Sequence, residues 1–330
     1  MRYSLLSRFR GALLGAAIAA SLGDRSLNAA VKSVQTQNIE SQSGEPQAQK
    51  SWIYYPIASA ESLIRCRDLD LSDWRDRIDD TGTGKPEIFL ERGSCIAALA
   101  ILPIILFYHE NKRLLLEKIE EAASVWPELG EFTDGMLIWG YAISQLLQEK
   151  PGRVEEFPKS LIDIVLSGIG TKARKADGQI QALDKIEKLC QQGVSLKTAV
   201  NELTAGSSGY MTSIALAFYC FLSTREDFRL SVLRAARTDK DTLLTCILTG
   251  ALSGAYNSTA GISLSWQMSR YASVQEPVQE MVKLGDRLFA AWSGAYDLEN
   301  IPLAIDKVAV AVPNAIRPLE GTQGSGGEAA

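Results

Sequence analysis

The spacing of apolar residues constrains the fold of this chain more than any other feature. Almost no stretch alternates apolar and polar residues with the period of two that a half-buried β-strand shows. Apolar residues instead recur three and four positions apart, for example at Met136, Trp139, Ile143 and Leu147. This spacing places them on one face of a helix. We therefore predict an all-α fold, in which a compact helical bundle surrounds one core.

The segments with this spacing are separated by residues typical of helix ends. Ser72 and Ser195 suit the N-cap position, where a side-chain oxygen accepts a hydrogen bond from a free backbone N–H, and Gly193 suits the position after a helix. Pro103 is expected to kink or interrupt the helix that contains it. The predicted helices cover residues 5–22, 56–66, 73–78, 92–108, 111–125, 131–149, 158–168, 180–189, 196–203, 210–223, 227–237, 241–256 and 273–293.

Three segments are not expected to be helical. Residues 25–50 are rich in Ser and Gln, which is typical of a mobile loop, and residues 79–87, DDTGTGKPE, are typical of a turn. Residues 313–330 contain EGTQGSGGEAA, which is typical of a disordered tail. Because no linker divides the rest of the chain, we predict one domain over residues 1–312.

The charge pattern and the cysteines narrow the function classes. The net charge is −5, and Lys and Arg are interspersed with acids, so we expect no nucleic-acid partner. The five cysteines have no C-x-x-C spacing, which predicts reduced core thiols and a cytoplasmic location. The only histidine is His109, so a zinc site or a Ser-His-Asp mechanism is not favoured. We predict that His109 lies on the solvent side of a helix end.

Two carboxylates and a hydroxyl gather at the predicted start of the 241–256 helix. Asp239, Asp241 and Thr242 belong to a D-x-D-T run, and their oxygens are the ligands that Mg²⁺ or Mn²⁺ prefers. The same residue types also satisfy free N–H groups in the first turn of a helix. From these residues alone, a metal site and a helix cap both remain open.

Two distant segments share a pattern of small and apolar residues. Residues 8–24 read RFRGALLGAAIAASLGD, and residues 209–256 begin GYMTSIALAFYC, contain the D-x-D-T run and end GALSGAY. GALLGAA and GALSGAY are each interpreted as the small-residue face of a helix. Together the segments resemble the ADP-ribosylglycohydrolase family. The resemblance implies an orthogonal all-α bundle over residues 8–297, with Asp24 closing the first helix.

The resemblance also implies a chemistry. In that family, two divalent metal ions lie between an upstream T-D-D run and the downstream D-x-D-T run. The ions position the ADP-ribose hydroxyls and an activated water, which hydrolyses the bond at ribose C1″. On this basis Asp239, Asp241 and Thr242 correspond to the downstream ligands.

Two apolar runs could be mistaken for a signal peptide or a membrane span. Basic residues before GALLGAAIAASLG are also typical of a signal peptide, but the resemblance makes this run the first buried helix. The run over residues 95–108 is shorter than the roughly 20 residues that span a bilayer. We therefore expect no membrane association.

The upstream half of the implied metal site is replaced in this chain. Where the family has W-T-D-D, the sequence reads Trp52-Ile53-Tyr54-Tyr55. An isoleucine and two phenols cannot replace carboxylates at neutral pH, because a phenol has a pKa of about 10. Two-metal chemistry needs ligands for both ions, so the residual half-site is not expected to hold two metals.

Charges beside the D-x-D-T run also depart from the family pattern. Arg237 and Thr238 stand where the family often has two glycines, and Lys240 lies between Asp239 and Asp241. Two close carboxylates without a metal repel each other and raise each other's pKa. We therefore hypothesise that Lys240, together with Arg237, supplies a built-in counter-charge.

Two further features have alternative interpretations. The run Asp79-Asp80-Thr81 is similar to the missing acidic run but lies downstream of its expected place, so an exposed turn is favoured. Trp52, Tyr54 and Tyr55 either fill the emptied cleft or line a pocket on which a base or a ribose stacks. Filling is the simpler interpretation.

These observations predict a family member that has lost the two-metal hydrolase activity, needs no cofactor, and acts as a binding or regulatory module. Its partner would be an ADP-ribose-like small molecule or a protein. The alternative is an active hydrolase of N- or O-glycosidic ADP-ribosyl bonds with an altered or single Mg²⁺ or Mn²⁺ site, and a third possibility is a scaffold subunit with a filled cleft. No catalytic residue is assigned. The candidate pocket residues are Asp24, Trp52, Tyr54, Tyr55, Arg237 and Lys240.

Overall fold

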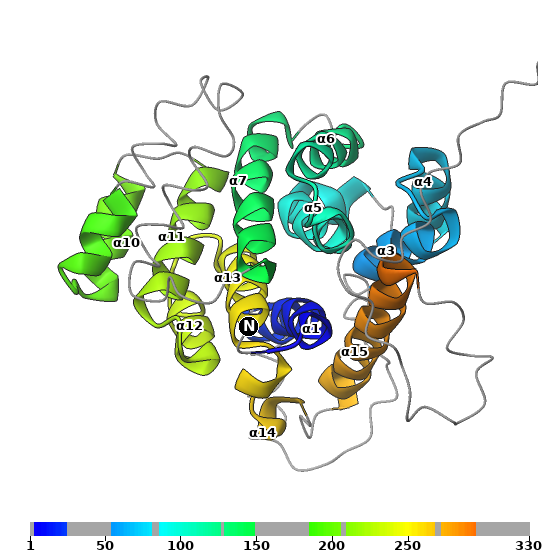
Figure 1. The fold of residues 1–330 in the computed structure, drawn as a ribbon. Helices are drawn as coiled ribbons and strands as arrows, with labels where there is room; N and C mark the ends of the chain where they lie inside the picture. The colour runs from blue at the N-terminus through cyan, green and yellow to red at the C-terminus, as the bar shows by residue number, and fades with distance from the viewer. Residues whose placement is uncertain are drawn as a thin grey trace, which may run out of the picture.

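Helices make up all the regular secondary structure in the described part of the chain, in agreement with the predicted all-α class (Figure 1). The computed structural model describes residues 3–24, 54–80, 86–126, 129–148, 185–205, 209–267 and 272–294. Its elements are α1 (Leu5–Gly23), α3 (Tyr54–Cys66), α4 (Leu71–Asp80), α5 (Pro86–Tyr108), α6 (Lys112–Ala123), α7 (Gly130–Leu147), α10 (Leu196–Thr204), α11 (Tyr210–Ser223), α12 (Phe228–Ala235), α13 (Thr242–Asn257), η4 (Thr259–Gly261), α14 (Leu264–Gln267) and α15 (Ala272–Ser293).

The first helix occupies the centre of the bundle. Residues 11–20 of α1 are all buried. Figure 1 shows α1 between α13 and α15, and α1 also contacts α5 and α7. Helices α11 and α12 cover α13 on the side away from α15, while α3 packs against both α5 and α15. The buried apolar side chains of these helices form one contiguous core cluster.

The contact between α1 and α13 is made through glycines. A Cβ on Gly15 would overlap the carbonyl oxygen of Gly250, and a Cβ on Gly254 would overlap that of Gly11. The two backbones approach closely because no side chain separates them. The two similar sequence segments are therefore facing helix surfaces, as predicted. Their contact also fixes the beginning of α13 beside the end of α1.

Several predicted helix ends are confirmed. Ser195 is the N-cap of α10, where its hydroxyl accepts a hydrogen bond from the N–H of Thr198. Gly193 has the left-handed φ of 58° expected after a helix end. Helix α5 runs through Pro103, so the interruption expected there is wrong, while the kink stays a prediction.

The N-cap predicted for α4 is wrong by two positions. Ser72 lies inside the helix, and the carboxylate of Asp70 accepts hydrogen bonds from the backbone N–H groups of Ser72 and Asp73. The carboxylate of Asp70 also accepts a hydrogen bond from the hydroxyl of Ser72. Asp70 is therefore the N-cap residue of α4.

The turn predicted after α4 is shorter than expected. Asp79 and Asp80 are the last residues of α4, and Pro86 already begins α5. Proline suits the first position of a helix, because the N–H that it lacks would have no partner there. The side chains of Asp79 and Asp80, and all of Thr81, lie outside the described residues.

The prediction that His109 faces solvent is also wrong. The side chain is only 1% exposed, and its Nδ1 lies 2.8 Å from the carbonyl oxygen of Leu106. Phe9 from α1 and Trp292 from α15 cover the ring, with ring centroids 5.3 and 5.0 Å away. The end of α5 is therefore buried by two helices distant in sequence.

Other predictions fall on residues outside the described ranges. These are the loop at 25–50, the helix at 158–168, the first part of the helix at 180–189, the side chain of Trp52, and the tail at 313–330. Residues 185–191 are helical, so the second part of the 180–189 helix is confirmed.

Among the described helices, α1 alone is long and apolar enough to cross a membrane by length and hydropathy. Of the window that meets this test, 67% is buried inside the bundle. In this fold α1 is thus a core helix.

Candidate active site

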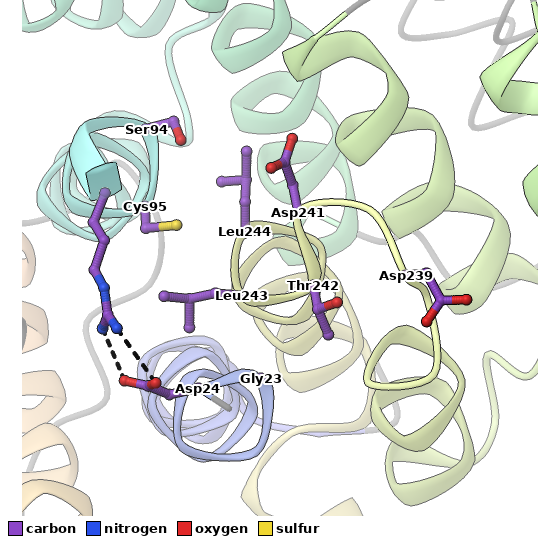
Figure 2. A pocket seen from close by; sticks show the side chains of 10 residues that line it. Gly23, Asp24, Ser94, Cys95, Asp239, Asp241, Thr242, Leu243 and Leu244 are labelled. Carbon is purple, nitrogen blue, oxygen red and sulfur yellow. Dashed lines mark hydrogen bonds and ion pairs between the residues drawn. The ribbon is translucent and has the colours of Figure 1, made fainter. Parts of the chain in front are cut away.

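A pocket of about 320 Å³ lies where the end of α1, the middle of α5 and the start of α13 meet (Figure 2). The loop between α12 and α13 contributes Asp239 and Asp241 to the lining. The lining residues come from these four segments and are Gly23, Asp24, Arg92, Ser94, Cys95, Asp239, Asp241, Thr242, Leu243 and Leu244. The structure thus brings together Asp24 and the D-x-D-T residues, which the sequence separates by more than 200 positions.

Asp241 holds the N-cap position of α13 without capping it. Its backbone is left-handed, with φ 37° and ψ 50°, and its side chain accepts no capping hydrogen bond. The carboxylate is exposed toward the pocket, and the hydroxyl of Ser213 donates to it at 3.3 Å. Non-glycine residues in this region cost free energy and often occur at functional sites. Of the two interpretations left open by the sequence, the structure does not support a helix cap for Asp241.

Thr242 and Asp239 differ from Asp241. The hydroxyl of Thr242 donates a hydrogen bond to the backbone carbonyl of Thr238, one turn earlier. Its hydrogen is therefore already used in a contact with the backbone. Figure 2 shows the carboxylates of Asp239 and Asp241 on different sides of the loop, directed away from each other. The two acids share a pocket wall but do not converge on one point.

These donors do not fit two metal ions. Within the described ranges, no three His, Cys, Asp or Glu side chains gather closely enough to hold even one ion. Each ion of a two-metal site needs its own set of ligands, and Asp239 and Asp241 do not converge.

Arg92 forms an ion pair with Asp24 inside the pocket (Figure 2). Its two terminal nitrogens donate to the two carboxylate oxygens of Asp24 at 2.8 and 3.4 Å. Asp24 is the C-cap residue of α1 and only 6% exposed, whereas the Arg92 side chain is 39% exposed. A buried carboxylate of this kind requires a paired cation, and α5 supplies it.

The wall opposite the D-x-D-T loop carries a thiol. Burial raises the pKa of Cys95 to about 12, and the negative charges of Asp241 and Asp24 add to this effect. The thiol is therefore protonated at neutral pH and is a poor nucleophile.

The cations predicted from the sequence lie elsewhere. Arg237 and Lys240 are both exposed on the loop before α13. Among the described residues, the one cationic side chain that lines the pocket belongs to Arg92. The counter-charge hypothesis for Lys240 and Arg237 stays a prediction.

Tyr54 and Tyr55, which stand where the family has two aspartates, differ in their exposure to solvent. Tyr54 begins α3 and is 42% exposed, whereas Tyr55 is 3% exposed and belongs to the core cluster. Neither is among the described residues that line the pocket. Trp52 and Ile53 lie outside the described residues.

Sequence reasoning missed Arg92, Ser94 and Cys95. One signal was present: Arg92 is the last charged residue before the long apolar run that ends α5. A cation at such a boundary can lie against a buried acid, but its partner could not be identified without the packing of α1 on α5.

Comparison with known proteins agrees with this architecture. The family model for ADP-ribosylglycohydrolase matches residues 1–297. A solved structure described as an ADP-ribosylglycohydrolase-related protein complex has a TM-score of 0.58 and 18% sequence identity to this chain, covering 87% of this chain and 99% of that chain. It establishes the likeness of fold. No curated protein matches the chain. From the extent of the family match, this chain belongs to the ADP-ribosylglycohydrolase family.

Proposed function

We propose that this chain has lost the two-metal hydrolase chemistry that the family resemblance implies and acts as a binding or regulatory module. The observation that carries the proposal is the donor set of the pocket. The carboxylates of Asp239 and Asp241 diverge, and the third acid of the lining, Asp24, is paired with Arg92. The rest of the lining contains the hydroxyls of Ser94 and Thr242, a neutral thiol, a glycine and two leucines. It adds no carboxylate, which is the ligand that Mg²⁺ or Mn²⁺ prefers.

The pocket supports a small-molecule ligand. Its volume of about 320 Å³ lies at the lower end of the range for small-molecule sites. Carboxylates, a guanidinium and a serine hydroxyl offer hydrogen bonds to a hydroxylated ligand such as the ribose of an ADP-ribose-like molecule. The exposed edge of Arg92 suits a phosphate, because a guanidinium presents paired N–H donors to anions.

A protein partner is the second branch of the proposal. A structure with this fold is described as a protein complex, and we extend that description to this chain as part of the proposal. The cytoplasmic location predicted from the unpaired cysteines belongs to the proposal as well, because all five cysteines are free thiols.

The test combines a hydrolysis assay with a binding assay. ADP-ribosylated arginine incubated with the protein and Mg²⁺ or Mn²⁺ should release no ADP-ribose above the blank. ADP-ribose titrated in the presence of EDTA should bind, and Ser94→Tyr, which fills the pocket, should abolish that binding. Ser263→Tyr changes an exposed serine outside the pocket and should leave binding unchanged.

The two assays distinguish an active hydrolase, a module that binds a small molecule and a module that binds a protein. Metal-dependent release of ADP-ribose would overturn the proposal and establish the alternative, an active hydrolase. Absence of both hydrolysis and ADP-ribose binding would remove the small-molecule branch and leave the protein partner.

A further inference from the structure

The pocket at the start of α13 has two polar ends of opposite charge. At one end the carboxylate of Asp241 is exposed, and the hydroxyl of Ser213 donates to it at 3.3 Å. Within the described ranges, no lysine or arginine side chain pairs with this carboxylate. At the other end lies the guanidinium of Arg92, whose side chain stays 39% exposed although it pairs with Asp24.

An apolar strip separates the two ends. Figure 2 shows Leu243, Leu244 and Cys95 between them. Beyond the effect of burial, the charge of Asp241 raises the pKa of the Cys95 thiol and the charge of Arg92 lowers it. The thiol is thus within electrostatic range of both ends, and it is itself neutral.

We propose that this pocket binds a small zwitterion with the chemistry of an amino acid, whose ammonium contacts Asp241 and whose carboxylate contacts the exposed edge of Arg92. The inference rests on the proposed role as a binding module and names a class of ligand in addition to ADP-ribose. The aliphatic carbons between the two charged groups of the ligand would lie on the apolar strip. The volume of about 320 Å³, at the lower end of the range for small-molecule sites, suits a ligand of this size.

An ammonium suits Asp241 better than a metal ion does. A metal ion needs several ligands that converge on one point, and the carboxylates of Asp239 and Asp241 diverge. An ammonium needs no such convergence, because a single carboxylate can accept a charge-assisted hydrogen bond from it. Asp241 can therefore hold an ammonium without help from a second acid.

Arg92 suits the carboxylate of the same ligand. Its two terminal nitrogens each donate one hydrogen bond to Asp24. Each of these nitrogens carries a second hydrogen, so the guanidinium can contact Asp24 and a ligand carboxylate at the same time. The pair with Asp24 fixes the guanidinium at the end of α1. The donors are thus positioned before the ligand arrives, which lowers the entropic cost of binding.

The experiment titrates the metal-stripped, full-length protein by calorimetry with β-alanine, γ-aminobutyrate and ε-aminocaproate, which differ only in chain length. For each of them, the alkylamine and the alkanoate of equal chain length keep one charged end. We expect at least one zwitterion to bind at least about tenfold more tightly than either of its one-ended matches, a difference of about 1.4 kcal/mol. The chain length that binds most tightly then indicates how far apart the two ends lie.

Two variants assign the ends. Asp241→Asn removes the charge and keeps a residue type that tolerates the left-handed backbone, so it should bind the zwitterion no more tightly than the matched alkanoate. Arg92→Gln combined with Asp24→Asn removes the guanidinium without leaving a buried, unpaired carboxylate. This double variant should bind the zwitterion no more tightly than the matched alkylamine.

The controls remove the same charges elsewhere. Asp76→Asn and Arg229→Gln change exposed residues outside the described lining and should leave binding unchanged. Circular dichroism establishes that each variant is folded. If the double variant does not fold, Arg92→Lys replaces it, because lysine keeps a cation for Asp24 but lacks the planar fork, and binding of the zwitterion should still weaken.

The zwitterion titration and the hydrolysis assay fail independently. Metal-dependent release of ADP-ribose would overturn the proposed function. Equal binding of the zwitterions and their one-ended matches, or binding of none of them, would overturn this inference alone. Tight zwitterion binding that persists in folded Asp241→Asn would also overturn it, because the ligand would then lie elsewhere on the protein.

Discussion

Asp241 keeps a backbone conformation that an aspartate adopts only at a cost in free energy. Its φ of 37° lies in the left-handed region, and its side chain gives no capping hydrogen bond in return. An L-residue in this region is destabilised by roughly 1–2 kcal/mol. The loop before α13 therefore places the carboxylate in the pocket at the expense of stability, which is typical of functional positions.

A glycine at this position should relieve the cost. We expect Asp241→Gly to be more stable than Asp241→Ala by about 1 kcal/mol, measured by urea denaturation. At Asp239, whose φ is not positive, the order should be reversed, because glycine there only increases the entropy of the unfolded chain. Equal stabilities of Asp241→Gly and Asp241→Ala would contradict the left-handed backbone.

Buried thiols give a second prediction for single residues. Burial raises the pKa of both Cys95 and Cys220 to about 12. At pH 8 the thiolate of Cys95 should therefore be roughly a thousandfold less populated than that of an ordinary cysteine.

Alkylation by iodoacetamide with mass-spectrometric readout measures this effect. Cys95 and Cys220 should stay unmodified in the native protein and react after denaturation, while the half-buried Cys66 should react first. At pH values above 8, where labelling of Cys95 becomes measurable, its rate should rise about tenfold per pH unit, since the thiolate fraction does so below its pKa. Rapid native labelling of Cys95 at pH 8 would show that it is neither buried nor protonated.

At the scale of helices, the contact of α1 with α13 positions the pocket. Glycines on both helices let backbone meet backbone, and that contact sets Asp24 at the end of one helix beside Asp241 at the start of the other. The register of the two helices and the shape of the pocket are therefore coupled.

A methyl group at this contact should separate the helices. Gly15→Ala would place its Cβ on the carbonyl oxygen of Gly250, and we expect a loss of about 3 kcal/mol in the free energy of unfolding, since backbone cannot yield as a side chain does. Gly130→Ala, with nothing within 4 Å of the added Cβ, is the control and should be neutral or slightly stabilising. A neutral effect of Gly15→Ala would refute the close packing.

The junction of α3 and α4 is held by a buried acid. Asp73 is 8% exposed and pairs with Arg65 on α3 and, at 2.9 Å, with Arg77 on α4. Burial by itself would raise the pKa of Asp73, but the hydrogen bond from Arg77 and the charges of both arginines outweigh it and lower the pKa below its usual value. The folded pKa thus lies below the unfolded one, so this stabilisation is present above about pH 4 and lost as pH falls through the folded pKa.

Asp73→Asn should therefore change how the free energy of unfolding depends on pH at acidic pH. We expect a loss of about 2 kcal/mol at pH 7 and a difference from the unmodified protein that shrinks below about pH 4, measured by denaturation across pH. The control is Asp76→Asn, at an exposed position of the same helix. A loss that stays constant down to pH 2 would exclude the ion pairs as its cause.

At the scale of the whole molecule, helical periodicity was sufficient to predict the all-α class, because it is a local pattern. The family fold was predicted only through the resemblance that residues 8–24 and 209–256 carry. The site was only partly predictable. The D-x-D-T run predicted Asp239, Asp241 and Thr242 as a residual metal half-site, and all three line the pocket. The partner of Asp24, however, is 68 positions away from it in the sequence. Arg92 meets it only through the packing of α5 near α1, which no local pattern encodes. The burial of His109 has the same origin, since α1 and α15 cover it.

For the whole molecule, we propose that the family fold is retained while its two-metal chemistry is lost. The family match covers residues 1–297, whereas the pocket at the D-x-D-T run contains an arginine-paired acid and two diverging carboxylates. Fold and chemistry can separate in this way, because the core determines the one and a few pocket residues determine the other.

The most direct measurement is a calorimetric titration of the unmodified, metal-stripped protein with Mn²⁺, with Asp241→Ala as the control. The account predicts no heat of binding for either protein. Micromolar binding by the unmodified protein that is lost in Asp241→Ala would contradict it, and would mean that the D-x-D-T run still forms a working metal site.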